Sequence, residues 1–98
     1  MQAKNISNGV KHLGIIISGL VQGVSFRYFA KEQADSLSIF GLVKNLDNGR
    51  VYIEVEGTED NLKKFVAWCQ SGPGLAKVEN VKIVENKLKN FINFKIEH

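Results

Sequence analysis

The 98-residue sequence predicts a single α+β domain, in which two helices lie on one face of a mostly antiparallel sheet. Three observations support this fold class. Two segments carry apolar residues at the spacing of an amphipathic helix, several short segments alternate between apolar and polar residues, and turn residues separate them. Taken in order, the segments are β-α-β-β-α-β followed by one further strand.

The first two elements are a strand and a helix joined by a loop. The strand covers roughly residues 11–18, with Leu13, Ile15 and Ile17 on one face, and the loop covers residues 19–24. The helix runs from about Ser25 to Leu37. The residues that recur at helical spacing are Phe26, Ala30, Gln33, Ala34 and Leu37, with Phe29 beside them.

The next two strands form a hairpin. They cover about residues 40–46 and 50–56, and the Asp47-Asn48-Gly49 turn between them supplies residues that tolerate positive φ. On the later strand, one face carries Val51, Ile53 and Val55, and the opposite, polar face carries Arg50, Tyr52, Glu54 and Glu56.

A second helix and two final strands complete the pattern. The helix begins after an N-cap at Thr58 and stops at Gly72-Pro73-Gly74. The last strands cover about residues 78–85 and 91–97. The apolar faces are Leu62, Phe65, Val66 and Cys69 on the helix and Ile92, Phe94 and Ile96 on the last strand.

This element order is that of the ferredoxin-like split βαβ sandwich. In that topology the first two strands run parallel, and the third lies antiparallel between them. The loop that leaves the first strand and the end of the second strand therefore lie at the same edge of the sheet, with backbones about 10 Å apart.

Composition and charge are those of an ordinary globular domain. A hydrophobic fraction of 44% with one Pro argues for a packed core and against disorder. Residues 1–10 are polar and aperiodic and are expected to form a flexible tail, so that residues 11–98 form the domain. The net charge of +3 favours an anionic ligand, although an ordinary basic protein would carry the same charge.

Cysteine usage and hydropathy favour a cytoplasmic protein without membrane association. Cys69 is the only cysteine, so no internal disulfide can form. The longest apolar stretch, Leu13 to Val21, is too short to span a bilayer. It follows Lys11 and His12, as in a signal peptide, but no cleavage site of small residues follows it. A monomer is the default expectation.

The loop before the first helix has the features of an anion site. The first amides of a helix lack intrahelical acceptors, and the helix dipole places positive partial charge there. Gly19 and Gly23 let the backbone curve, and Arg27 can grip a phosphate with two hydrogen bonds. Spacing alone leaves two interpretations open, because the glycines can simply form a turn and Arg27 can be a solvated surface residue.

Two motifs resemble the signatures of the acylphosphatase family. The first is Ile17-x-Gly19-x-Val21-Gln22-Gly23-Val24-x-Phe26-Arg27. The second is Gly41-x-Val43-Lys44-Asn45-x-x-x-Gly49-x-Val51, with Gly57 at the expected distance. The two motifs have the order and separation of that family, and the resemblance covers roughly residues 11–98.

The resemblance implies an enzyme that hydrolyses small-molecule acyl phosphates to a carboxylate and inorganic phosphate. It implies that Arg27 pairs with phosphate oxygens and that Asn45 orients the attacking water. The backbone amides implied to hold the phosphoryl group are those of Gln22, Gly23, Val24, Ser25, Phe26 and Arg27. The family uses no metal or other cofactor, and the substrate's own phosphate is a proposed acceptor for the proton of the water.

The residues of the loop are compatible with this chemistry. No His, Asp, Glu or Cys lies between Gly19 and Arg27, so no general acid, base or nucleophile is local. An acyl phosphate has a carboxylate leaving group with a pKa of about 4, so it needs no proton from the enzyme. Positioning and charge stabilisation remain as the catalytic requirements. A metal cluster is not expected, because His12 and His98 are far apart in the sequence.

Three positions depart from the family pattern. Leu42 stands where the second signature usually has an aromatic residue, and this replacement is expected to loosen the packing near Asn45. Ser25 and Ser38 stand where glycine is common. A left-handed Ser38 would cost about 1 kcal/mol relative to glycine.

Two other functions fit the sequence less well. The alternative is a non-catalytic ferredoxin-like module that binds a phosphate-bearing ligand or RNA. RNA-binding domains of this shape need aromatic residues on the central strands, and the polar face offers only Tyr52, so a nucleic-acid partner is not expected. The remaining possibility is a maturation-factor domain similar to acylphosphatase that acts on carbamoyl phosphate within a larger protein.

Overall fold

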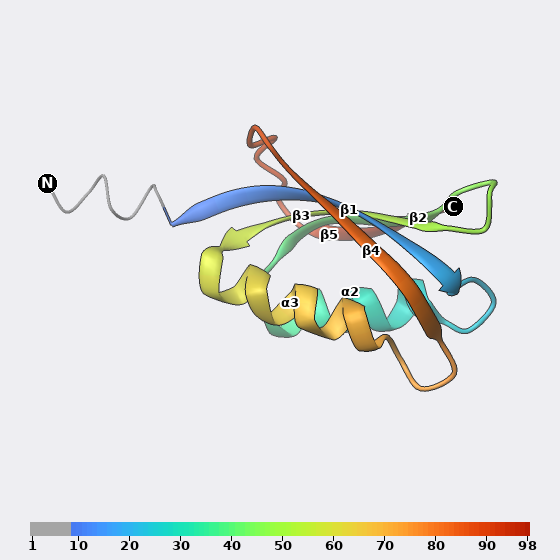
Figure 1. The fold of residues 1–98 in the computed structure, drawn as a ribbon. Coiled ribbons are helices and arrows are strands. Elements are labelled where there is room, and N and C mark those ends of the chain that lie inside the picture. The colour runs from blue at the N-terminus through green and yellow to red at the C-terminus, as the bar shows by residue number, and fades with distance from the viewer. Residues whose placement is uncertain (1–8) are drawn as a thin grey trace, which may run out of the picture.

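The computed structural model describes residues 9–98, which form two helices packed on a five-stranded sheet (Figure 1). The elements are β1 (Val10–Leu20), α2 (Phe26–Ser36), β2 (Phe40–Asn45), β3 (Val51–Thr58), α3 (Glu59–Ser71), β4 (Lys77–Asn86) and β5 (Phe94–Glu97). Within this part of the chain, neither helix is long and apolar enough to cross a membrane.

The sheet has the strand order β4-β1-β3-β2-β5. β1 and β2 both pair antiparallel with β3, which lies between them, and β4 pairs antiparallel with β1. β5 pairs parallel with β2. The predicted ferredoxin-like α+β fold, with its mostly antiparallel sheet, is therefore confirmed.

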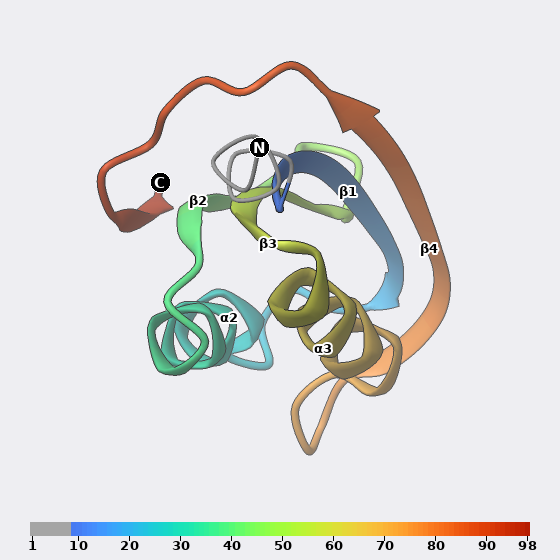
Figure 2. The same cartoon turned by 90° about the vertical axis from the view of Figure 1, so that its left-hand side faces the viewer.

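Both helices cover the same face of the sheet, as Figure 2 shows. Trp68 on α3 is half-buried, and its ring centroid lies 5.3 Å from that of Phe26 on α2. This ring contact joins the two helices. Burial raises the pKa of the Cys69 thiol, which makes this cysteine a packing residue. The buried helix residues are Phe26, Ala30 and Ala34 on α2 and Leu62, Phe65 and Cys69 on α3, and all of them belong to the predicted stripes.

The outermost strands differ from the prediction at their ends. β1 begins at Val10, inside the segment assigned to the tail, and residues 1–8 lie outside the described residues. β5 begins only at Phe94. Ile92, which was expected to share the apolar face of Phe94, lies before the strand and is 85% exposed. The alternating apolar pattern wrongly assigned Ile92 to the strand, because residues 87–93 cross over the sheet and do not form part of its edge strand.

Residues 87–93, which we call the strap, connect β4 to β5 and arch over the sheet face opposite the helices (Figure 2). Alternation placed Glu54 and Glu56 on the polar face of β3. Both carboxylates are in fact only 6% exposed, because the strap lies over this part of the face. Buried carboxylates require hydrogen-bond donors, and the strap supplies them.

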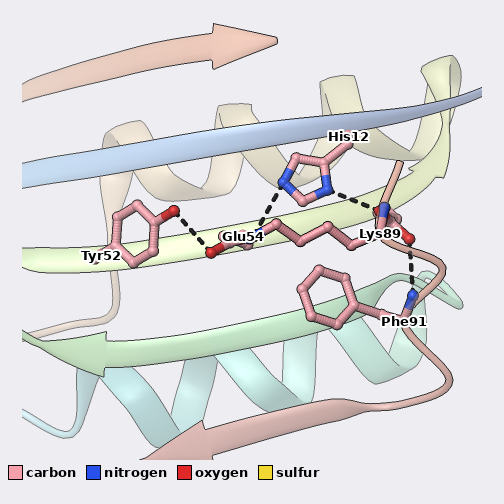
Figure 3. Close-up of polar contacts among 6 residues, drawn as sticks. His12, Tyr52, Glu54, Lys89 and Phe91 are labelled. Carbon is pink, nitrogen blue, oxygen red and sulfur yellow. Dashed lines mark hydrogen bonds and ion pairs between the residues drawn. The ribbon is translucent and has the colours of Figure 1, made fainter. Parts of the chain in front are cut away.

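A buried polar cluster joins the sheet to the strap (Figure 3). His12 Nδ1 lies 2.8 Å from a Glu56 oxygen, within hydrogen-bonding distance. His12 Nε2 lies 3.1 Å from a Glu54 oxygen, but the geometry of this contact is not that of a hydrogen bond. Glu56 also accepts hydrogen bonds from the backbone N–H groups of Lys89 and Phe91. The Lys89 ammonium lies 2.9 Å from Glu54, and the Phe91 ring stacks on His12 with centroids 5.8 Å apart.

These contacts determine how the carboxylates ionise. Burial alone would raise the pKa of Glu54, but the Lys89 ammonium and the hydrogen bond from Tyr52 outweigh burial and lower it. Burial would likewise raise the pKa of Glu56, but the bonds from His12 and from two strap amides lower it. Burial and the hydrogen bond to Glu54 raise the pKa of Tyr52 to about 12, so Tyr52 remains a donor. The strap is therefore held by ionised carboxylates at neutral pH.

Candidate active site

A hollow of about 430 Å³ opens at the sheet edge where β2 and β5 end and α2 begins. Arg27 and Asn45, the two residues expected to carry the chemistry, both line it. Of the residues 22–27 predicted to bind phosphate, all but Val24 line this hollow. The Val24 side chain packs against the core instead. The complete lining is Val21, Gln22, Gly23, Ser25, Phe26, Arg27, Tyr28, Asn45, Ile96 and His98.

The backbone amides at the start of α2 are available to an anion. The first hydrogen bond of the helix runs from the Phe29 amide to the Ser25 carbonyl, at 3.1 Å. No amide from Gln22 to Tyr28 donates to a backbone oxygen within residues 9–98. Because this end of the helix also carries positive partial charge, the wall of the hollow suits a phosphate group.

Backbone conformation explains the shape of the loop. Gly23 has φ of 76° and Ser25 has φ of 62°, and left-handed residues in a turn direct successive N–H groups toward a common point. Gly23 adopts this conformation freely, whereas it strains Ser25 by about 1 kcal/mol. Gly19 has φ of 124°, which fits the expected curve of the backbone, and it has a second role as well. A β-carbon there would lie 2.2 Å from the Lys77 carbonyl oxygen, so Gly19 is needed for the close approach of β4.

The side chain of Gln22 ties the loop to the β2–β3 hairpin. Its Nε2 donates to the carbonyls of Leu46 and Arg50, at 2.7 and 2.9 Å. Leu46 directly follows Asn45 in the chain. Sequence reasoning gave Gln22 a role only through its backbone amide, whereas its side chain sets the separation between the loop and Asn45.

Arg27 is half-buried and bound to the end of β5. Its Nη1 donates to the Glu97 carbonyl at 3.0 Å and lies 3.3 Å from Nδ1 of His98. These contacts hold the guanidinium at the hollow, so Arg27 is not simply a solvated surface residue. Sequence reasoning did not place His98 at the site. The missing signal was the parallel pairing of β5 with β2, because the carboxyl ends of parallel strands meet at one sheet edge.

Leu42 lies away from the hollow. Its neighbour Val43 is buried under the helices, whereas Leu42 faces the strap, where it lines a separate hollow with Lys89 and Phe91. Leu42 and Asn45 are three positions apart on β2 and therefore lie on opposite faces of the sheet, so the structure does not support the expectation that Leu42 loosens the packing near Asn45.

Charge distinguishes the active-site hollow from another one beside α3. Among residues 9–98, no Asp or Glu side chain lines the former, and Arg27 and the start of α2 contribute positive charge to it. The hollow beside α3, of about 340 Å³, has an equal number of basic and acidic residues, Lys11, Lys63, Glu59 and Glu85. Across residues 9–98, no three His, Cys, Asp or Glu side chains are grouped so as to hold a metal ion.

Comparisons with known proteins give consistent results. The family model described as Acylphosphatase matches residues 13–96. An acylphosphatase of Archaeoglobus fulgidus is 45% identical over 86 residues, which is 88% of this chain and 97% of the relative. The crystal structure of acylphosphatase from Bacillus subtilis superposes with a TM-score of 0.88 at 39% identity, covering 90% of this chain and 99% of that one.

A domain of a much larger protein is also similar. The crystal structure of HypF from T. kodakarensis superposes with a TM-score of 0.80 at 29% identity. The match covers 90% of this chain but only 12% of the HypF chain. The fold is therefore shared between short acylphosphatases and one part of HypF, and the sequence identity is higher to the former.

Proposed function

Because this chain belongs to the acylphosphatase family, we propose that it hydrolyses acyl phosphates through Arg27, Asn45 and the amides before α2. One observation carries the assignment of these residues. A guanidinium, a side-chain amide and the unpaired amides of a helix start line the same hollow, and no carboxylate side chain lies among them.

In the proposed reaction, the phosphoryl group lies against the amides of residues 22–27 with Arg27 on its oxygens. Asn45 holds a water in line with the bond to be broken. The oxygen of this water bonds to phosphorus as the bond from phosphorus to the acyl oxygen breaks. The carboxylate leaves with the electron pair, and the proton of the water passes to a phosphoryl oxygen.

We propose that the reaction needs no metal, since positioning and charge stabilisation suffice for a carboxylate leaving group. We also propose that the protein is a cytoplasmic monomer. The single, buried Cys69 supports a reducing compartment.

We propose that the protein has no nucleic-acid partner, because the sheet face opposite the helices lacks an open surface for base stacking. Tyr52, the one aromatic expected there, is half-buried and donates its hydroxyl to Glu54 at 2.8 Å. The acidic side chains of Glu54 and Glu56 and the overlying strap occupy the surface on which single-stranded RNA would stack.

Benzoyl phosphate hydrolysis in the presence of EDTA tests the proposal. Wild-type protein should release phosphate at an unchanged rate with the chelator. Arg27→Ala should lose at least about a hundredfold in kcat/KM, because a charge-stabilising donor is removed. Asn45→Ala should lose mainly kcat, because the water is no longer oriented.

The matched control is Lys64→Ala, which removes one exposed positive charge from α3 and should retain full activity. Circular dichroism establishes that each variant is folded. A folded Arg27→Ala protein with wild-type turnover would refute the assignment. A salt-dependent RNA gel shift at micromolar protein without any hydrolysis would favour the binding module instead.

A further inference from the structure

We propose that His98 is a positioning residue, whose imidazole works with the Glu97 carbonyl to orient Arg27 toward the phosphoryl group. This inference rests on the proposed function of Arg27 as the phosphate-binding cation. It assigns a role at the site to a side chain that contacts Arg27 at 3.3 Å and lines the same hollow.

The hydrogen-bonding capacity of arginine determines what His98 does. A guanidinium has five N–H donors and no acceptor, and two of these donors are on Nη1. The Glu97 carbonyl, at 3.0 Å, and His98 Nδ1, at 3.3 Å, are both contacts of Nη1. Nδ1 must therefore be the acceptor, and the imidazole carries its proton on Nε2.

Both hydrogens of Nη1 are thus engaged by the end of β5. No other hydrogen bond of the Arg27 side chain is found within residues 9–98. The Nε and Nη2 edge of the guanidinium remains available, and this edge can bind two oxygens of a phosphate side by side. The contacts to Glu97 and His98 limit rotation of the guanidinium before the substrate arrives, which lowers the entropic cost of binding.

The contacts of β5 with α2 place His98 beside Arg27. Lys31 lies one turn after Arg27 on α2, and its ammonium donates to the Phe94 carbonyl at 3.0 Å. Lys31 and Arg27 therefore clamp α2 to both ends of β5. Phe94 is 3% exposed and anchors the strand in the core. His98 is exposed, directly follows this strand and lines the hollow.

The test compares His98→Ala with His98→Asn at pH 8. Asparagine places its Oδ1 on the same carbon, Cγ, that carries Nδ1 in histidine, so it retains the acceptor. Lys95→Ala is the matched control, because it removes an exposed side chain from β5 without touching Arg27. Inorganic phosphate is the binding probe, measured by calorimetry, and benzoyl phosphate is the substrate.

His98→Ala should weaken phosphate binding and raise KM by about tenfold, with kcat within about threefold of wild type, since a bond to a charged donor is lost. His98→Asn and Lys95→Ala should stay within about threefold of wild type in both measurements. Unchanged phosphate affinity in His98→Ala would overturn the proposal, as would His98→Asn behaving like His98→Ala.

Phosphate binding separates this proposal from the proposed function. If wild type binds phosphate and His98→Ala weakens it while benzoyl phosphate is not hydrolysed, the positioning role stands and the catalytic assignment fails. Nitrogen-15 NMR of the imidazole gives an independent readout. The spectrum at pH 8 should show His98 protonated at Nε2, and protonation at Nδ1 instead would refute the hydrogen bond to Arg27.

Discussion

The side-chain amide of Gln22 lies 2.7 Å from the carbonyl oxygen of Leu46, and this contact connects two parts of the candidate active site. A second bond from the same nitrogen to Arg50 spans the base of the hairpin turn. Gln22 thus holds the phosphate loop at a fixed distance from Asn45, although the two belong to different elements.

Replacing Gln22 by Ala should therefore lower both stability and activity. Two hydrogen bonds are lost, so the free energy of unfolding in urea should fall by about 1–2 kcal/mol. The loosened loop should reduce kcat/KM for benzoyl phosphate by about tenfold. Gln22→Glu should be worse than Gln22→Ala in both measurements, because a carboxylate faces two carbonyl oxygens without a donor. Wild-type stability in Gln22→Glu would contradict this role.

Ser38 offers a test of backbone strain outside the site. It directly follows the C-cap of α2 with φ of 54°, which is the left-handed conformation whose cost was considered from the sequence. Ser38→Gly should therefore raise the free energy of unfolding by about 0.5–1 kcal/mol and leave kcat/KM unchanged. The control, Ser36→Gly, changes the last residue of the helix and removes its hydroxyl bond to the Gln33 carbonyl, so it should change stability in the opposite direction. Two changes of the same sign would refute the strain.

The buried cluster predicts how stability depends on pH. The pKa of Glu56 is lowered in the folded protein, so its ionised form stabilises the fold above the ordinary value of about 4.5. That contribution is lost as the pH falls through the lowered pKa. The stability difference between wild type and Glu56→Gln should be largest near neutral pH and shrink below about pH 4.5. Urea denaturation at a series of pH values measures it.

Glu79 is exposed, so Glu79→Gln serves as the control for the pH series. Its free energy of unfolding should stay close to that of wild type at every pH. A gap between wild type and Glu56→Gln that stays constant from neutral to acid pH would show that ionisation of Glu56 does not hold the strap.

Leu42 stands where the family usually has an aromatic residue, and its position in the structure predicts what restoring the aromatic would do. Because its side chain faces the strap, Leu42→Phe should alter kcat/KM for benzoyl phosphate by less than about twofold. Its effect should appear in thermal stability, through packing against Phe91. A change in kcat/KM of tenfold or more, in a protein of wild-type stability, would restore the expectation that Leu42 acts on Asn45.

The sequence was sufficient for the features that depend on periodicity and topology. Alternation and helical spacing predicted the elements and the apolar stripes, and the β-α-β order alone predicted that Arg27 and Asn45 lie at one edge of the sheet. These inferences succeeded because local patterns and crossover rules fix them.

Long-range polar contacts were not predictable in the same way. Glu54 and Glu56 followed strand alternation, but nothing local indicated that residues 87–93 would cover them. The contacts of Gln22 with the hairpin and of His98 with Arg27 depend on tertiary packing between distant segments. Alternation also failed for Ile92, since the strap does not pair as a strand.

The parallel pairing of β5 with β2 also bears on the order in which the molecule folds. It joins Gly41 to Phe94, and the contact between Arg27 and Glu97 spans 70 positions of the chain. Contacts so distant in sequence form slowly, because a long loop must close before they stabilise anything. A folding intermediate with both helices docked but β5 still undocked would possess the phosphate loop without an oriented guanidinium. Catalytic competence would then be the last property to emerge during refolding.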